Sequence, residues 1–500
     1  MPLLLELLLL INFAIGPSAL AEEAVLKGFI SRIHPNSLHP FDNSDAVTYN
    51  QINQIFDTLV TFDENGNIVP ALAESWKWLD TTTLEMKLRK EVTFHDGEAL
   101  DSQSVQFTFE LFTSPKLRIE NRQYADTIRQ VIVVDSHTVH IKTSKPDSFL
   151  VQKLATVGHI IPKKRFLREG HESFSKKPVG TGPFQFVHSD FKTKLVLRKN
   201  PKYWHKPPEI DQLELHYLPN FDVALDLFKK GEIHFISHFP GNLTKHLIGL
   251  ENITVSKQLT YRSIQVLLNT MKKDSPLKNR EFRKALWKAI DFEEIVRYQD
   301  EGNGKTTTSL SLAGEAFFNP TIPKVIPSFK QEPSLLRAKS YPFKMLVSEP
   351  LGLVGEMVAK QIQDKGIQVE AQFGNSLDGA AHVLNHKLKG TTPEIDFLVS
   401  YCSHPYPAFP YLIMLASRGN WSLTQDPILD RMIEDASSDF DPVTQQRKFL
   451  KITQYVHDEA LLFPGYQFRD IYVHDGRFEF HPHPTGYIFF KYAKLRGKAL

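Results

Sequence analysis

Only one cysteine, Cys402, occurs in the 500 residues of this chain. A single thiol excludes any intramolecular disulfide and any site built from a pair of cysteines. The fold must therefore be stabilised by buried apolar surface, and 41% hydrophobic with 23% charged residues is an ordinary globular balance. Because the chain is too long for one ordinary domain, we expect two or three globular lobes.

The N-terminus has the pattern of a secretory signal peptide. An apolar run from Leu3 to Ile15 is followed by Gly16-Pro17 and then by Ala19-Leu20-Ala21. A short apolar run before an Ala-x-Ala site predicts cleavage after Ala21. The run is shorter than the ~20 apolar residues that span a bilayer, so cleavage is favoured over a membrane anchor. No Lys or Arg precedes the run, which leaves the true start codon open.

Charge and motifs argue against several classes of function. The formal net charge is +2, and no clustered basic face predicts a nucleic-acid partner. The sequence contains no HExxH, GxSxG or Walker motif, so we expect neither an enzyme nor a bound cofactor. Because Cys402 lies far from the predicted cleavage site, we expect no lipid anchor and a free periplasmic protein.

Apolar alternation predicts strands in the first half of the chain. It occurs at Leu84–Leu88, at Val139–Ile141 and repeatedly between Pro178 and Pro219. Strands and helices are mixed without a repeating βαβ order, which favours α/β lobes with mixed sheets.

Helical spacing and capping residues predict three helices. One is expected from its cap Ser102 to Phe112, and a strongly amphipathic one covers Phe282–Ile290. Asp291 and Glu294 have the spacing of a capping box for the next helix.

Several separated blocks occur in the order found in one protein family. They are Pro70–Trp76, Lys87–Lys90, Phe94–Glu98, Val105–Glu110, Pro178–Phe184, Arg198–Trp204, Leu268–Thr270, Arg280–Asp291 and Asp426–Ala436. On these blocks the chain resembles the family 5 extracellular solute-binding proteins, the oligopeptide-, dipeptide- and nickel-binding class of ABC transporter substrate-binding proteins. Most blocks also have a structural interpretation: Ala73–Trp76 is expected to form a short helix with Trp76 in a core, and Asp96-Gly97 a turn.

The resemblance implies a type II periplasmic-binding-protein fold of the α/β class. It consists of two hinged lobes with mixed sheets plus an extra α/β domain. The expected division is a signal peptide at 1–21, lobe I at 22–60, 180–268 and 476–500, lobe II (the extra domain) at 61–179, and lobe III at 269–475. These lobe names are used below for these ranges.

The resemblance also implies a function without bond-making chemistry. A peptide-like solute is expected to bind between lobes I and III, and the permease subunits of an ABC importer are the expected partners of a monomeric receptor. Hinges near Gly180, Gly182 and Asn269 would let the lobes close on the ligand. Ligand contacts made only in the closed state would shift a pre-existing open–closed equilibrium.

The segment from Tyr401 to Pro407 resembles the part of the family that binds the charged end of the ligand. An aspartate that pairs with a peptide α-amino group is replaced here by His404. A histidine near neutral pH does not offer the permanent negative charge of a carboxylate. Another acid serves, the ligand lacks a free amine there, or the ligand is an anion or a metal complex. The expected ligand-binding residues are Tyr401, Cys402, Ser403, His404, Tyr406 and Phe409.

Other ligands and functions stay open at this point. His404, His481 and His483 are weak candidates for a metal site, because imidazole suits nickel, and surface histidines are the simpler interpretation of the last two. A nickel or other metal chelate and an oligosaccharide are alternative ligands for the same fold. A periplasmic sensor, a scaffold or a hydrolase is the alternative of another class.

Overall fold

The structure is a computed structural model that describes residues 23–31, 35–42, 46–114, 126–328, 338, 340–348, 351–374 and 376–496, without the side chains of 31, 46, 300 and 376–381. The predicted signal peptide, 1–21, lies outside the described residues. Within these ranges no helix has both the length and the apolar character needed to cross a bilayer.

An eleven-stranded mixed sheet forms the backbone of the molecule, in the order β15-β14-β16-β12-β17-β11-β1-β10-β9-β8, with β13 paired to β17. Its strands are β1 (Val25–Ser31), β8 (Phe184–Ser189), β9 (Lys194–Lys199), β10 (Gln212–Tyr217), β11 (Phe235–Ile236), β12 (Ile253–Leu268), β13 (Lys305–Thr306), β14 (Phe343–Ser348), β15 (Val369–Gly374), β16 (Phe397–Ser403) and β17 (Leu462–Asp475). The strands predicted between Pro178 and Pro219 are confirmed as β8, β9 and β10.

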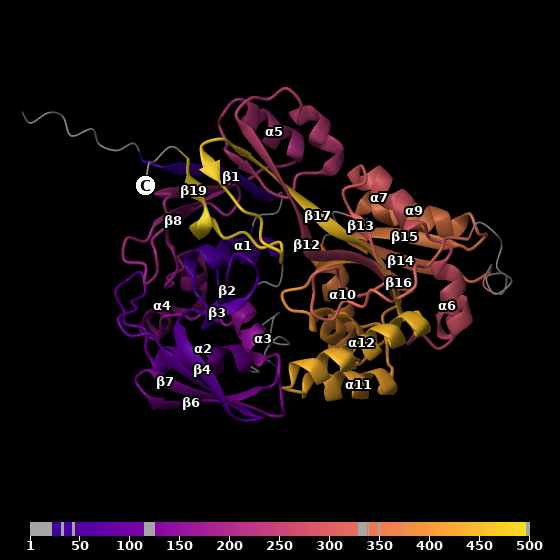
Figure 1. Cartoon of the computed structure of the whole chain (residues 1–500), viewed down its shortest axis with the longest axis horizontal. Coiled ribbons are helices and arrows are strands. Elements are labelled where there is room, and N and C mark those ends of the chain that lie inside the picture. The colour runs from indigo at the N-terminus through magenta and orange to yellow at the C-terminus, as the bar shows by residue number, and fades with distance from the viewer. Residues whose placement is uncertain are drawn as a thin grey trace, which may run out of the picture.

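The sheet has two parallel regions joined by an antiparallel pair. β1 lies parallel to β10 and β11, and β14 lies parallel to β15 and β16. Between these regions β12 and β17 run antiparallel over most of their length, and Figure 1 shows them crossing from one half of the molecule to the other. The α/β fold class with mixed sheets is confirmed.

A separate four-stranded sheet, β4-β5-β7-β6, lies in lobe II. Its strands are β4 (Ala73–Asp80), β5 (Thr83–Leu88), β6 (Ile128–Asp135) and β7 (Thr138–Thr143), and a small hairpin of β2 (Val60–Phe62) and β3 (Ile68–Pro70) precedes them. The strands predicted at Leu84–Leu88 and Val139–Ile141 are confirmed. The short helix predicted at Ala73–Trp76 is wrong, because this segment is part of β4 and pairs with β5. Trp76 is half-buried and packs against the large apolar core.

Helices cover both sheets (Figure 1). They are α1 (Ala46–Ile55), α2 (Ser102–Thr113), α3 (Leu150–Val157), α4 (Lys163–Lys176), α5 (Phe221–Lys229), α6 (Arg280–Trp287), α7 (Phe292–Asp300), α9 (Gly352–Gln363), α10 (Ser376–Leu388), α11 (Pro427–Ser437) and α12 (Pro442–Glu459). Short turns of helix are η2 (Gly241–Leu247), η3 (Pro276–Lys278), η4 (Tyr411–Leu415) and η5 (Phe490–Tyr492), and β18 (Phe478–Glu479) pairs with β19 (Lys494–Leu495).

The predicted helices are present, with boundary corrections. Asp101, not Ser102, caps α2, because the Asp101 carboxylate accepts the backbone N–H of Ser104. Helix α6 ends at Trp287, three residues before the predicted end at Ile290. The Asp291 cap of α7 is confirmed by its hydrogen bond from the backbone N–H of Glu294.

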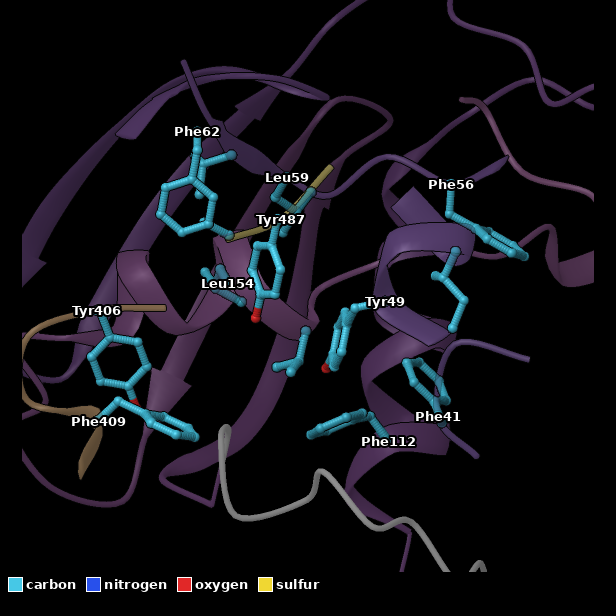
Figure 2. Close-up of a cluster of buried hydrophobic side chains, with 14 of the residues drawn as sticks. Phe41, Tyr49, Phe56, Leu59, Phe62, Phe112, Leu154, Tyr406, Phe409 and Tyr487 are labelled. Carbon is cyan, nitrogen blue, oxygen red and sulfur yellow. The ribbon is translucent and has the colours of Figure 1, made fainter. Parts of the chain in front are cut away.

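The largest apolar core runs through all three predicted lobes. It contains Leu26 of lobe I, Leu84 of lobe II and Phe409 of lobe III, all buried. Figure 2 shows part of this core, where side chains distant in sequence pack together. A second core fills lobe III under α6, α7 and α9, and a third packs α5 against the sheet in lobe I.

The segment around Gly180 and Gly182 touches the end of α1. A Cβ on Gly180 would lie 2.1 Å from the Ile55 carbonyl oxygen, and one on Gly182 would lie 2.5 Å from the Ile55 carbonyl carbon. The Gly182 N–H donates to that same oxygen at 2.9 Å. His95 Nε2 lies 3.0 Å from the Gly182 carbonyl oxygen, and burial lowers the pKa of His95 to about 4. A neutral imidazole therefore helps to hold this close approach.

Replacing Gly180 by alanine is expected to lower the free energy of unfolding by about 1–3 kcal/mol, because the added methyl group would overlap the Ile55 backbone and force it to shift. The matched control is Gly28→Ala, since a Cβ at Gly28 meets its nearest neighbour at 3.4 Å, an ordinary contact. Urea unfolding at neutral pH measures both. Equal stability of the Gly180→Ala variant and the wild type would contradict the packing described here.

Candidate functional site

The pairing of β12 with β17 is irregular at the middle of the molecule. Leu259 pairs with Arg469 and Ser263 with Gln467, so β12 has extra residues between these two pairs. Extra residues in one strand of a pair form a bulge that bends the strand. The bulge lies where the ladder passes from its lobe I end, at β11, to its lobe III end, at β16.

A buried ion pair holds this bulge. Arg262 Nη1 lies 2.6 Å from Asp470 Oδ1, and the Thr260 hydroxyl donates to Asp470 Oδ2 at 2.9 Å. The Asp470 side chain is 5% exposed and the Arg262 side chain 15%. Burial alone would raise the pKa of Asp470, but the charge of Arg262, with His238 and these hydrogen bonds, holds it below its usual value. The carboxylate therefore stays ionised beside the guanidinium.

Unsatisfied polar atoms surround this pair. Arg262 Nε, Ser403 Oγ and the Tyr472 hydroxyl are buried without a hydrogen-bond partner. Arg262 and Ser403 are directly opposite in the β12–β16 ladder, so their side chains are on the same face of the sheet. Buried polar atoms in native proteins are normally paired, which makes these atoms candidates for contact with a bound solute.

The predicted ligand segment begins in β16 and continues into the turn before η4. Tyr401 is half-buried, and the guanidinium of Arg262 lies 5.7 Å from the centre of its ring. Cys402 is fully buried, and burial together with the charge of Glu315 raises the pKa of its thiol well above the usual value. Cys402 is therefore a neutral packing residue in this structure.

His404 is completely buried beside an acid that sequence reasoning missed. Its Nδ1 lies 3.0 Å from Glu315 Oε1, and its Nε2 lies 3.4 Å from the Ser263 hydroxyl. Glu315 Oε2 accepts the backbone N–H of Leu312 at 2.5 Å. Nothing in the sequence links Glu315 to His404, because the two lie on separate segments that only the fold brings together.

Tyr406 and Phe409 lie in the aromatic part of the large core. Phe149 of lobe II stacks on Tyr406 with ring centres 6.0 Å apart, and the Tyr406 and Phe409 rings meet edge to face at 5.6 Å. Tyr49 and Tyr487 of lobe I stack at 6.0 Å, and Figure 2 shows them in the same cluster as Tyr406 and Phe409. Aromatic side chains of all three predicted lobes therefore meet here.

Polar contacts also join lobes II and III. Lys145 Nζ lies 2.6 Å from Glu434 Oε1, and the backbone N–H of Ser148 donates to the Ser437 carbonyl at 3.0 Å. These contacts and the Phe149 stack hold lobes II and III against each other in this structure.

The predicted hinge residues lie at element ends. Gly180 and Gly182 are in the crossover against Ile55, and Asn269 follows the last residue of β12. The Asn269 side-chain amide donates to the carbonyls of Pro393 at 2.9 Å and Ile395 at 2.7 Å. These bonds tie the end of β12 to the segment that enters β16.

The predicted histidine candidates have separate partners. His483 is buried, with Nδ1 2.6 Å from the Thr485 hydroxyl and Nε2 2.8 Å from the Asp63 carbonyl oxygen. Burial lowers the pKa of His483 to about 4. His481 is exposed and contacts Glu479 at 2.8 Å. One group of three potential metal ligands is found among the described residues, and it contains none of His404, His481 and His483.

A cavity of about 420 Å³ lies elsewhere, between α7 and the segment 305–327. Phe292, Lys305, Pro327 and Gln467 are among its lining residues, and all of its lining residues belong to lobe III. One of its lining residues, Gln467, donates to the Thr260 carbonyl at 3.0 Å and so contacts the bulge of β12.

Comparison with known proteins identifies the family. The sequence profile described as "Bacterial extracellular solute-binding proteins, family 5 Middle" matches residues 67–390. The chain belongs to this family. Family 5 membership places it among solute-binding proteins that act outside the cytoplasm.

Relatives and solved structures agree with this assignment. The chain is 27% identical over 277 residues to the oligopeptide-binding protein AppA of Bacillus subtilis (strain 168), an alignment covering 54% of this chain and 50% of AppA. It is 24% identical to the probable di/tripeptide-binding protein 5 of Pseudomonas aeruginosa (strain UCBPP-PA14), covering 84% and 87%. The periplasmic binding protein DppA of Helicobacter pylori, solved with the peptide STSA, superposes with a TM-score of 0.82 at 21% identity, covering 95% of this chain and 98% of DppA.

The extent of these matches differs between sequence and structure. The chain spans about half the length of the first curated relatives it matches, 50% and 52% of them. The likeness to DppA covers nearly both chains and establishes the fold, the type II periplasmic-binding-protein architecture.

Replacing Asp470 by asparagine is expected to lower the free energy of unfolding by about 3–5 kcal/mol, because Arg262 is then buried without its counter-charge. Asp475→Asn is the matched control on the same strand, since Asp475 pairs with Arg477, whose side chain is 62% exposed. An exposed pair contributes at most about 1 kcal/mol. Denaturant unfolding at neutral pH compares the variants, and similar losses in both would show that the bulge does not depend on this pair.

Proposed function

We propose that this family 5 protein is the substrate-binding component of an ABC importer and binds a peptide-like solute between lobes I and III. The observation that carries the proposal is the contact region between these lobes, where buried polar atoms without partners lie beside aromatic side chains. Such a combination of apolar walls and a few polar groups is typical of small-molecule sites. AppA is an oligopeptide-binding protein and DppA was solved with a bound peptide, which favours a peptide over other solutes.

The lobes open and close about β12 and β17. These strands link the two parallel regions of the sheet, and the bulge held by Arg262 and Asp470 lies between them. The strands can bend at this bulge while the backbone pairing of β12 with β17 on either side of it stays intact. Gly180, Gly182 and Asn269 mark the further points at which the chain passes between the predicted lobes. The Phe149 stack and the Lys145–Glu434 pair separate when the molecule opens.

The protein acts in the periplasm. The signal peptide at 1–21 directs its export and is then cleaved. The mature protein is a monomer that binds the permease subunits of the importer. The family consists of solute-binding proteins, which supports a receptor without catalysis rather than a hydrolase, sensor or scaffold.

Ligand addition to the purified mature protein tests the proposal. A pool of short peptides is expected to give saturable heat in calorimetry and a smaller radius of gyration in small-angle scattering. Nickel with histidine and a pool of short oligosaccharides form the comparison arms. Heat and contraction with either of these, and none with peptides, would replace the peptide by that solute. Turnover of a peptide would indicate a hydrolase, and no response to any arm would indicate a sensor or scaffold.

The His404–Glu315 pair determines how the end of the peptide is held. Both oxygens of the Glu315 carboxylate already have hydrogen-bond partners, His404 and the Leu312 N–H, so neither is directed at a ligand ammonium. We therefore infer that Tyr401–Phe409 contacts the ligand without selecting for a free α-amino group. The side chains that make these contacts are proposed to be Tyr401, Ser403, His404, Tyr406 and Phe409, with Cys402 as a buried packing residue of the same segment.

Acetylating the N-terminus of a bound peptide is expected to change the affinity of the wild type by less than about threefold, on the scale where 1.4 kcal/mol is tenfold. His404→Asp alone would place two carboxylates in contact, so the informative variant combines it with Glu315→Gln. This double variant is expected to prefer the free amine by roughly tenfold to a hundredfold, the range of a hydrogen bond to a charged group. Glu315→Gln alone is the control, and calorimetry measures all three. A wild type that rejects the acetylated peptide would contradict the inference.

A further inference from the structure

Three potential metal ligands meet where the N-terminal segment of lobe I packs on α4 of lobe II. They are His39, Asp42 and His171, and one donor atom from each lies within 4.8 Å of the others. His171 Nε2 is 2.8 Å from Asp42 Oδ1, and His39 Nδ1 is 3.8 Å from the same oxygen. Among the described residues, this is the one group of three such side chains that the fold brings together.

The distances suit a small divalent cation. Zinc binds imidazole nitrogen at about 2.0–2.1 Å and carboxylate oxygen at about 2.0–2.2 Å. Tetrahedral geometry at those bond lengths separates neighbouring donor atoms by roughly 3.4 Å. The observed 2.8 and 3.8 Å lie on either side of this value, so small side-chain rotations suffice.

Surrounding hydrogen bonds orient the carboxylate. The Ser37 hydroxyl donates to Asp42 Oδ2 at 2.6 Å, which leaves Oδ1 directed at the two imidazoles. The backbone N–H of His39 in turn donates to the hydroxyl oxygen of Ser37 at 3.0 Å. Partners of this kind fix the orientation of metal ligands in known sites.

His39 is buried, with its unprotonated nitrogen toward Asp42. Its side chain is 2% exposed, and its Nδ1 accepts the backbone N–H of Phe41 at 3.2 Å, so Nδ1 is unprotonated, and a bound ion would take over the lone pair that now accepts this hydrogen bond. Nε2 is buried and has no hydrogen-bond partner. The His171 ring is tilted against the His39 ring with centres 4.5 Å apart, and Phe174 packs edge-on to His39 at 5.6 Å.

The backbone places His171 in this position. Gly170 has φ +75° and interrupts α4 immediately before His171. The Leu38 N–H donates to the Ser175 carbonyl at 3.0 Å and ties the N-terminal segment to the end of the same helix.

We propose that His39, Asp42 and His171 form a binding site for a divalent transition-metal ion of the zinc class, which clips the N-terminal segment to α4. Two imidazole nitrogens and one carboxylate oxygen are a ligand set that zinc accepts, with a remaining position open to water. Asp42 and His171 are partly exposed, which gives an ion access to the site. The site shares no residue with the proposed peptide site, so its occupant is a structural ion rather than transported cargo.

The test is competition between the metal-free mature protein and a chromophoric zinc chelator. Wild type is expected to bind one Zn²⁺, and His171→Ala or Asp42→Asn to weaken binding by more than about a hundredfold. Ser37→Ala, which removes only the orienting hydroxyl, is expected to weaken it by about 10- to 100-fold. Co²⁺ in place of Zn²⁺ is expected to give visible absorption bands of tetrahedral coordination in the wild type and not in His171→Ala.

His481→Ala is the matched control. His481 also contacts a carboxylate at 2.8 Å and is 57% exposed, against 44% for His171, but within the described part of the chain it belongs to no group of three potential ligands. Its loss is expected to leave zinc affinity unchanged. A wild type that binds no Zn²⁺, or binds it equally well in His171→Ala, overturns the proposal and leaves His171 and Asp42 as an ordinary ion pair. Peptide binding in His171→Ala, measured in parallel, reports separately on the proposed transport function.

Discussion

The antiparallel ladder of β12 and β17 is the constraint on which the rest of the structure depends. It is the only part of the main sheet that links the region around β1 to the region around β14 among the described strands. Backbone hydrogen bonds join β12 and β17 on both sides of the bulge and keep each side of the ladder in place. Fewer of these bonds form at the bulge itself. The buried Arg262–Asp470 pair stands at that position and replaces the missing ladder bonds with side-chain contacts.

Several elements of the fold could be predicted from local patterns in the sequence, whereas the overall architecture was predicted from the family resemblance. Alternation at Leu84–Leu88 identified β5, and the Asp291 cap identified the start of α7, because both depend on residues close in the chain. The segment at Trp76 was mispredicted as a helix because its pairing with β5 outweighs local preference. The end of α6 at Trp287 was missed for a related reason: apolar spacing continues to Ile290 although the helix does not.

The candidate site could be predicted only in part. The order of family blocks led to Tyr401–Phe409, but the acid beside His404 lies on a segment that sequence spacing cannot connect to it. Arg262 and Asp470 were missed for the same reason, since their pairing follows from the register of β12 against β17. The cluster of His39, Asp42 and His171 likewise joins a loop to a helix whose break at Gly170 gives no sign of its partners. Contacts across long sequence separations are the information that one sequence does not contain.

The burial of Cys402 has a practical consequence for experiments on motion. A thiol that is fully covered and strongly disfavoured as a thiolate reacts slowly with maleimides and other labelling reagents. A cysteine introduced on the surface of each of two lobes can therefore carry a fluorescent dye while the native residue stays in place. The distance between the dyes then follows opening in a chain whose aromatic core is otherwise unaltered.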